Sequence, residues 1–236
     1  MIQLTDASTD RSLAAQVHAR LRSDIVHARL RPGELLSENQ QAMRLGVSRT
    51  PVREAVQRLV REGWVHVLPQ RGTRVSLLSM QRIEEALFVR EAVETHGVRR
   101  LFDRHPDNTD WSSLEQCIRA QKNALNAQDL EAIMQADATF HRTLLELSGM
   151  GAVWPIVAQA RDMHQRVRAI AVPELLSGEQ ALKDHRAIVL ALRRHDGALA
   201  IRKIESHLKH NAVLVQKIAD RHPDYFEREP HADRLH

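Results

Sequence analysis

Four side chains in the C-terminal half of the chain have the residue types and positions of metal ligands. Asp137 and His141 lie one helical turn apart, on the same stripe as the apolar residues around them. His185 and His207 each interrupt an apolar stripe in a later segment. Three imidazoles and a carboxylate from three helices suit a divalent transition metal. The spacing leaves a second option open, in which Asp137 and His141 satisfy each other by a hydrogen bond.

Helical segments must position these four side chains. From residue 80 onward the apolar residues recur with helical periodicity, and no alternating strand pattern is present. The predicted helices span residues 80–103, 110–127, 129–148, 151–171, 179–195 and 197–219. The sequence therefore predicts an all-α six-helix bundle over residues 80–220.

Arg90 is a candidate for binding an anion inside this bundle. It lies on the inner stripe of the first predicted helix, with Glu94 one turn away. One interpretation is a buried ion pair with Glu94, and the other is a guanidinium that binds the carboxylate of an effector. Asn211, one turn beyond His207, is a second candidate contact for that effector. The pattern does not decide the orientation of three further candidates: His164, Arg166 and Arg168.

The N-terminal region has the pattern of a helix-turn-helix. Ser37 is placed to cap a first helix, and Gly46 supplies a turn. Ser48 is placed to cap a second helix, and Pro51 falls in its first turn, where an amide proton is expendable. Two short alternating segments, 64–67 and 73–75, then predict a hairpin, or wing.

The domain boundaries follow from these patterns. Residues 11–75 are predicted to form a winged helix-turn-helix domain and residues 80–220 the helical domain. The sequence predicts a flexible tail at 1–10, a linker at 76–79 and a polar tail at 221–236. The predicted fold class is mainly α: an N-terminal winged helix-turn-helix domain plus a C-terminal all-α six-helix bundle.

Arginines lie where such a domain meets DNA. Arg49, Thr50 and Arg53 are at the start of the second helix and off its apolar face, the position that presents side chains to base edges and phosphates. Arg71 and Gly72 lie at the tip of the wing. The alternative is an ordinary small core with solvated arginines, but the ordered combination of features favours nucleic-acid binding.

The charge of the chain is unevenly distributed. Residues 1–75 contain 12 arginines, no lysine and 7 acidic residues, a net charge of +5, whereas the remainder contains 22 basic and 23 acidic residues. The only cysteine, Cys117, has no disulfide partner within the chain, and no apolar run approaches the length of a membrane span, about 20 residues. With no signal peptide pattern, we expect a cytoplasmic protein without membrane contact.

The stretch GVSRTPVREAVQRLVREGWV, followed by QRGTRV, resembles the GntR family of bacterial winged-helix regulators. The resemblance covers roughly residues 10–76. It places Ser48, Arg49, Thr50 and Arg53 at the family's DNA-contacting positions and Gly72 at the wing tip. Glu38 also matches the family pattern. The sequence departs from it at Asn39, where an arginine is usual, so a DNA contact is lost there or made by hydrogen bonding alone.

Residues 80–220 resemble the ligand-sensing FCD domain of FadR-type GntR regulators. The resemblance rests on ATFHRTLLELSGM, DHRAIVLAL and ESHLKHN, which occur in the expected order. With six predicted helices, the domain resembles the VanR-type branch of these regulators. The resemblance implies that the metal ligands are Asp137, His141, His185 and His207, and that an arginine of the first bundle helix, here Arg90, binds ligands.

Together these observations predict a homodimeric transcription factor, with a repressor preferred over an activator. It would bind double-stranded operator DNA, and a small organic acid at the metal would control that binding. Zinc is the first choice of metal, with nickel and manganese as alternatives. The rival functions are a metal-responsive regulator and a metal-dependent hydrolase. An enzyme is disfavoured because no HExxH motif is present and no second carboxylate is placed as a base.

Overall fold

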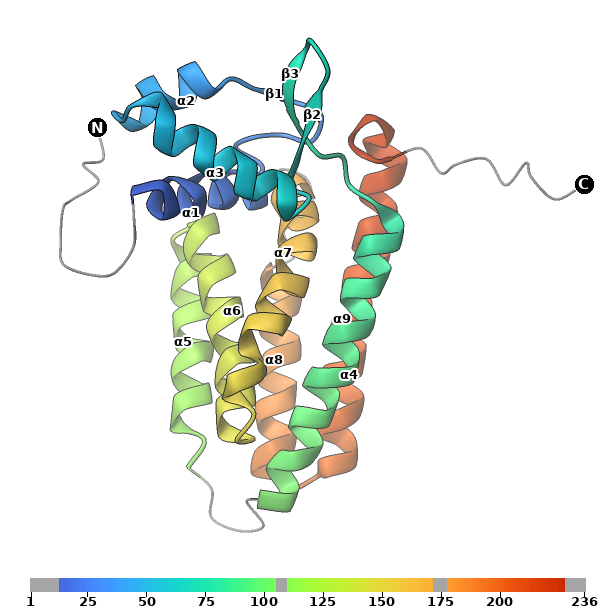
Figure 1. Cartoon of the computed structure of the whole chain (residues 1–236). Coiled ribbons are helices and arrows are strands. Elements are labelled where there is room, and N and C mark those ends of the chain that lie inside the picture. Colours follow the sequence, from blue (N-terminus) through green and yellow to red (C-terminus); the bar gives the residue numbers. More distant parts are fainter. Residues whose placement is uncertain (1–12, 105–109, 172–177, 228–236) are drawn as a thin grey trace, which may run out of the picture. The chain divides into compact units, whose positions relative to one another are not determined.

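The computed structural model of the chain describes residues 13–104, 110–171 and 178–227. The chain divides into two compact units, shown with their elements in Figure 1. One unit takes the residues up to Met80 together with those from His222, and the other takes residues 81–221. This division confirms the predicted class, a small winged domain and a helical domain.

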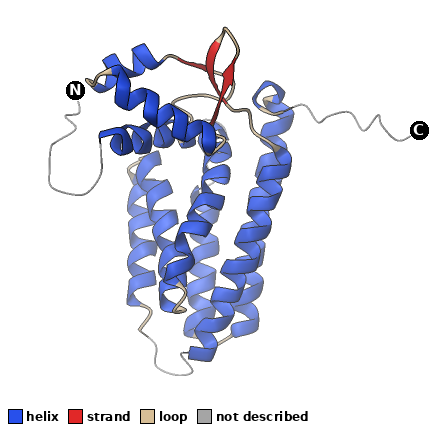
Figure 2. Cartoon of the chain, in the orientation of Figure 1, coloured by secondary structure: helices blue, strands red, loops and turns tan. Residues whose placement is uncertain are grey.

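The first unit is a winged helix-turn-helix. Its elements are α1 (Leu13–Val26), β1 (Leu35–Leu36), α2 (Glu38–Leu45), α3 (Arg49–Arg61), β2 (Val65–Leu68) and β3 (Gly72–Val75). The strands form an antiparallel sheet in the order β1-β3-β2, drawn in red in Figure 2. The two-residue strand β1 was not predicted, because two residues are too few to show an alternating pattern.

The turn chemistry of the helix-turn-helix agrees with the sequence at two of three positions. The Ser37 hydroxyl accepts a hydrogen bond from the amide of Gln40, and Gly46 ends α2 with a φ of 67°. Ser48 stands at the N-cap of α3 in extended conformation, but its side chain makes no capping hydrogen bond. The expected hydroxyl cap at Ser48 is therefore wrong, and this hydroxyl remains exposed to solvent.

The core of the winged domain lies between α1 and α3. Val17, Leu21 and Ile25 are fully buried on α1. On α3 the buried side chains are Val52, Ala55, Val56 and Leu59. Their spacing of three and four residues forms one apolar face, so the opposite face of α3 remains in solvent.

The second unit is a helical bundle. Its helices are α4 (Met80–Arg104), α5 (Ser112–Asn126), α6 (Leu130–Leu147), α7 (Trp154–Ala171), α8 (Gly178–Arg193) and α9 (Gly197–Arg221), with a short 3-10 turn, η1 (Gly151–Val153), before α7. Each helix corresponds to a predicted one. Two predicted breakers, His105-Pro106 and Pro173, fall outside the described residues. Among the described helices, none has both the length and the apolar character to span a membrane.

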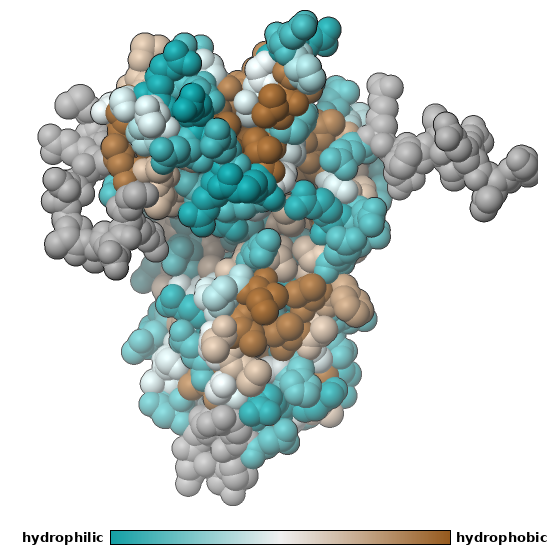
Figure 3. Space-filling view, in the orientation of Figure 1, coloured by the Kyte–Doolittle hydropathy of each residue, from teal (hydrophilic) through white to brown (hydrophobic). Residues whose placement is uncertain are grey.

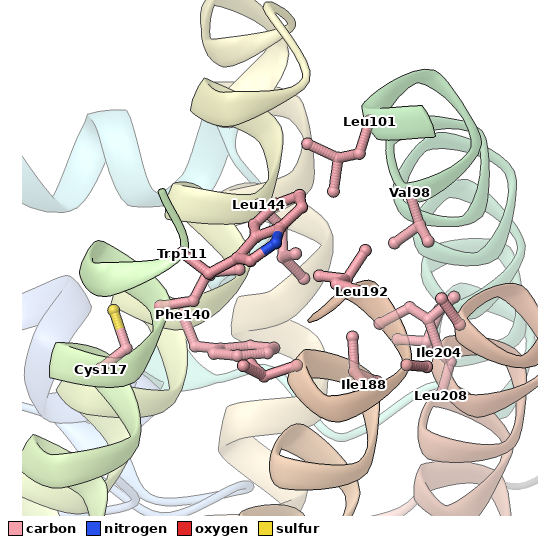
Figure 4. Packing of buried hydrophobic residues seen from close by; sticks show 14 residues of the cluster. Val98, Leu101, Trp111, Cys117, Phe140, Leu144, Ile188, Leu192, Ile204 and Leu208 are labelled. Atoms are coloured by element: carbon pink, nitrogen blue, oxygen red, sulfur yellow. The ribbon is translucent and has the colours of Figure 1, made fainter. Parts of the chain in front are cut away.

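One continuous apolar cluster holds the helices of the bundle together. Figure 4 shows Phe140 of α6 near Trp111 and near Ile188 of α8, while side chains of α4 and α9 complete the cluster on the opposite side. The fully buried members of this cluster include Val98, Leu114, Phe140, Ile188, Leu192 and Ile204. Phe140 and Leu208 are adjacent in sequence to His141 and His207, and Ile188 lies one helical turn after His185. This core therefore fixes the helices that carry the candidate metal centre.

The segment after α9 pairs with the segment before α4. The amide of Leu78 donates to the carbonyl of Tyr225 at 2.8 Å, and the amide of Glu227 donates to the carbonyl of Leu78 at 2.8 Å. Leu78 is 1% exposed and Phe226 is 7% exposed. Residues of the predicted linker at 76–79 and of the predicted polar tail from 221 therefore contact each other, a pairing that the sequence analysis did not include. Single apolar residues within polar segments give no periodic signal, so the sequence could not predict that Leu78 pairs with the segment around Phe226.

Candidate metal centre and DNA-binding surface

The four predicted ligands meet in the interior of the helical domain. Asp137 and His141 of α6, His185 of α8 and His207 of α9 each offer one ligand atom, and these four atoms lie within 4.8 Å of one another. The Nε2 atom of His207 is 3.3 Å from Nε2 of both His141 and His185. All four residues are at most 5% exposed.

The outer nitrogen of each imidazole has a hydrogen-bonding partner. Nδ1 of His141 pairs with Glu94, and Nδ1 of His207 lies 3.2 Å from Asp184. Nδ1 of His185 lies 2.9 Å from the amide oxygen of Gln121. The ring of His185 also stacks on Phe140, with 3.9 Å between ring centroids. Such partners fix the orientation of an imidazole and the nitrogen that carries its proton.

These partners decide what the inner nitrogens can do. A carboxylate accepts hydrogen bonds, so the Nδ1 atoms of His141 and His207 must carry the protons. In neutral rings their Nε2 atoms are then bare lone pairs 3.3 Å apart, which cannot hydrogen-bond each other. A second proton on one ring, or a cation bound by both lone pairs, would make this arrangement favourable. Ligand atoms at zinc distances and tetrahedral angles are separated by about 3.3–3.4 Å, so the donor set fits such an ion.

Asp137 is held by two guanidiniums on its outer side. Arg161 donates to its Oδ2 atom at 2.5 Å and Arg168 donates to the same atom at 3.2 Å. Burial opposes ionisation, but the charges of Arg168 and Arg161 hold the pKa of Asp137 well below its usual value. Its Oδ1 atom is buried without a hydrogen-bond partner among the described residues and lies 3.9 Å from Nε2 of His185. Asp137 therefore presents an anionic oxygen to the cluster.

The imidazoles of His141 and His185 have lowered pKa values. Burial lowers the pKa of His141 to about 4, although Glu94 opposes that shift. Burial and the neighbouring His207 lower the pKa of His185 from its usual value. Near pH 7 both rings are neutral and have lone pairs available for a metal.

The two candidate effector contacts have different outcomes. The Nε atom of Arg90 donates to Oε1 of Glu94 at 2.7 Å, which is the ion pair that the sequence offered as one interpretation. Its Nη2 atom is buried without a partner among the described residues. The side chain of Asn211 lies outside the described part of the chain.

Sequence reasoning missed three residues around the centre: Gln121, Asp184 and Arg161. Gln121 and Asp184 are ordinary polar residues within their helices. Only the packing of α5 against α8 brings Gln121 to His185, and only that of α8 against α9 brings Asp184 to His207. Arg161 shares a helical stripe with His164 and Arg168, at spacings of three and seven residues. All three side chains are buried, so their common stripe was the sequence feature that could have identified Arg161.

A shallow surface hollow of about 380 Å³ gathers most of the predicted DNA contacts of the winged domain. Its lining residues are Leu35, Leu36, Ser37, Glu38, Asn39, Arg49, Arg71, Gly72 and Thr73. The start of α2, the start of α3 and the wing tip therefore converge. Gly72 has a φ of 93°, a backbone conformation that glycine adopts readily. Ser48, Thr50 and Arg53 are exposed beside this surface, on or just before α3.

The arginines of the winged domain fall into two groups. Arg29 and Arg44 hold the buried carboxylate of Asp24 at 2.7 and 2.5 Å, and Arg58 pairs with Glu62 at 3.0 Å. No ion pair involves the exposed guanidiniums of Arg49, Arg53 and Arg71 within the described residues. Their positive charges are therefore available to an external anion.

The comparison with protein families agrees with this architecture. Residues 13–75 match the family described as bacterial regulatory proteins, gntR family, and residues 85–210 match the FCD domain. The chain belongs to the GntR family. It is a DNA-binding transcriptional regulator with an FCD domain, and the resemblance found in the sequence is confirmed.

Similar proteins cover most of this GntR regulator. The HTH-type transcriptional repressor RspR of Escherichia coli (strain K12) is 31% identical over 214 residues, which are 91% of this chain and 93% of that protein. A regulator in an unstable DNA locus of Streptomyces ambofaciens is 34% identical over 210 residues, covering 89% of this chain and 88% of that one. A solved GntR regulator from Rhodococcus sp. RHA1 has the same fold, with a TM-score of 0.74, 24% identity and coverage of 87% and 99%.

Proposed function

We propose that this GntR regulator is a repressor whose operator binding is controlled by a small organic acid bound at a divalent metal. The observation that carries the proposal is the buried set of Asp137, His141, His185 and His207, in which two imidazoles turn bare lone pairs toward each other. A cation between them removes the need for a buried imidazolium. Zinc is the first choice, with nickel and manganese as alternatives that accept more ligands.

The metal proposal is tested by elemental analysis of tag-free protein purified without added metal. We expect about one divalent ion per chain, removal of the ion by a chelator, and a lower melting temperature after removal, because bound metal stabilises the folded state. His185→Ala should lose the ion. His96→Ala, at an exposed histidine of α4, is the control and should retain it. Protein that neither contains nor takes up a metal contradicts the proposal.

The effector would reach the metal together with the second guanidinium nitrogen of Arg90. The Nε atom of Arg90 donates to Glu94, while Nη2 is a buried donor without a partner in the described part of the chain, so it can donate to an anionic oxygen of the effector. Asn211 remains a proposed hydrogen-bonding contact. Arg90→Lys keeps a charge for Glu94 but loses the bidentate fork. We expect this variant to bind metal and operator and to lose most of its response to the acid.

The same measurements separate the rival functions. A metal-responsive regulator would leave operator DNA on metal addition alone, without an acid. A hydrolase would turn over candidate substrates, whereas a sensor only binds them. Release of operator DNA by an unchanged acid supports the effector-controlled repressor.

On the DNA side, we propose that Ser48, Arg49, Thr50 and Arg53 contact bases and phosphates from the start of α3. Arg71, with Gly72 at the wing tip, would contact the adjacent minor groove or its phosphates, and Glu38 would help to position the start of α2. Arg71→Ala should weaken binding on every probe if the contact is a phosphate, or at A·T positions alone if it reads the minor groove. Unchanged affinity on all probes removes the wing from the interface.

A homodimer would let two recognition helices read a pseudo-palindromic operator. The face of the helical domain in Figure 3 carries a hydrophobic patch over α4 and α7, the helices on which Phe88 is 74% exposed and Ile156 is 57% exposed. A second copy of the chain would cover this patch. Phe88→Glu should shift the mass in solution toward the monomer. Leu190→Glu, at a 47% exposed leucine of α8, is the matched control and should not.

A further inference from the structure

One ring nitrogen of a buried histidine near the candidate metal centre has no group to donate a hydrogen bond to it. His164 of α7 is 2% exposed, and its Nδ1 atom lies 3.3 Å from the carbonyl oxygen of Ala160. A carbonyl only accepts, so Nδ1 must carry the proton. The Nε2 atom is then the acceptor of a neutral ring, and it is buried without a hydrogen-bond partner among the described residues.

Protonation does not relieve this imbalance near neutral pH. Burial, with the charge of Arg90 acting in the same direction, lowers the pKa of His164 to about 3, although Glu94 opposes that shift. The charge of Arg161 also lowers this pKa. A buried acceptor without a donor costs about 1–3 kcal/mol, so the site favours any ligand that brings a donor.

The neighbouring charges decide which kind of donor is accepted. Arg90 and Arg161, whose charges act on His164, each have one buried guanidinium nitrogen without a partner in the described residues, Nη2 and Nη1 respectively. These atoms donate to an anion. Glu94 and Asp137 already pair with these guanidiniums, so an ammonium group would add a further buried charge, whereas a hydroxyl is a neutral donor. The site thus offers cationic donors for a carboxylate and a neutral acceptor for a hydroxyl.

We propose that His164 makes the regulator selective for hydroxycarboxylates: its Nε2 atom accepts a hydrogen bond from the hydroxyl of the effector while Arg90 and Arg161 contact the carboxylate. This inference rests on the proposed function, because it names the chemical class of the acid that the same site binds. A site built to hydrogen-bond a hydroxyl rejects the analogue without it, since the buried acceptor is then unpaired.

The test compares matched acids on the purified metal-loaded protein by titration calorimetry. The pairs are lactate with propionate and malate with succinate, and alanine and aspartate supply the ammonium analogues. We expect each hydroxy acid that binds to bind at least about tenfold more tightly than its partner, which corresponds to about 1.4 kcal/mol, and the amino acids to bind most weakly. Equal affinity within the pairs overturns the assignment and leaves the proposed function intact. If no acid in the panel binds, the proposed function fails as well.

A hydroxyl can also bind the metal, so a variant must identify His164 as the cause of the preference. His164→Phe keeps a ring of similar shape without the acceptor, and His164→Gln returns an acceptor oxygen. We expect the preference to collapse in the phenylalanine variant and to recover at least partly in the glutamine variant, with metal content unchanged in both. His96→Ala is the control. A hydroxyl preference that survives His164→Phe assigns the selectivity to the metal and overturns the role of His164.

Discussion

The candidate anion-binding arginines of the two domains differ in burial and in ion pairing. On the winged domain, Arg49, Arg53 and Arg71 are exposed and none has an ion-pair partner among the described residues. In the helical domain, Arg90 and Arg161 are 3% exposed, and each holds a buried carboxylate, Glu94 or Asp137. The first set costs little to maintain in water. The second requires its partners, because a desolvated charge without a partner is strongly unfavourable.

The difference in burial determines which kind of anion each set of arginines can bind. Exposed guanidiniums attract any polyanion, act nearly independently and weaken with salt, as expected for a DNA-binding surface. Buried guanidiniums are screened little by salt and are coupled to every charge around them. They therefore suit a small anion of defined geometry.

The largest expected effect comes from breaking a buried pair. Asp137→Ala leaves Arg161 and Arg168 buried without their shared carboxylate, so we expect the free energy of unfolding of chelated protein to fall by about 3–5 kcal/mol. Glu115→Ala, which removes the exposed partner of Arg193, should cost no more than about 1 kcal/mol. Urea denaturation measures both. Similar losses in the two variants would contradict the distinction between the two environments.

The pH dependence of stability is the next largest effect. The folded pKa of His164, about 3, is below the usual value of about 6.5, so the unfolded chain binds the proton first as the pH falls. The contribution of His164 to the free energy of unfolding is therefore fully present above about pH 6.5 and is lost as the pH falls toward the folded pKa. Between pH 6.5 and 4.5 this one group should remove about 2–3 kcal/mol, at 1.36 kcal/mol per pH unit.

Chelated His164→Phe protein tests this effect. Its free energy of unfolding should depend less steeply on pH over the same interval than that of chelated wild type. His96→Ala, at an exposed site, should keep the wild-type slope. Equal slopes for wild type and His164→Phe would show that His164 is accessible to protons in the folded state.

DNA affinity should respond to the exposed arginines by a smaller amount for each residue. Arg49→Ala or Arg53→Ala should weaken operator binding by about 1–3 kcal/mol and leave the melting temperature nearly unchanged, since neither side chain is buried. Arg193→Ala removes the same charge from the helical domain and is the control. Fluorescence anisotropy at several salt concentrations measures both affinity and salt slope. Full affinity in a folded double variant would refute the interface.

The smallest expected effect separates two serines that occupy equivalent helix positions. The Ser37 hydroxyl caps α2 by a 3.4 Å hydrogen bond, whereas the Ser48 hydroxyl makes no capping bond to α3. We expect Ser37→Ala to cost about 0.5–1 kcal/mol of stability and Ser48→Ala to cost less. Ser48→Ala should instead weaken operator binding. A stability loss at Ser48 equal to that at Ser37 would assign it a structural role.

Residue spacing in the sequence defined the secondary-structure elements and the direction in which some side chains point. Apolar periodicity defined six bundle helices, and it placed Asp137 and His141 on the inward face of one of them, because spacing on a helix fixes direction relative to that helix's own stripe. Turn chemistry at Ser37 and Gly46 defined the helix-turn-helix. The charge count located the DNA-binding domain. Interrupted apolar stripes marked His185 and His207, and the resemblance to the FCD domain implied all four ligands.

The tertiary structure alone decided which partners meet across helices. That Glu94 would serve His141 as well as Arg90, and that Arg161 would hold Asp137, depends on the register in which α4, α6 and α7 pack. Register is a property of side-chain interdigitation between helices, and no periodicity within one helix encodes it. For the same reason, the pairing of Leu78 with the segment around Phe226 emerged only when residues about 150 positions apart were brought together by the fold.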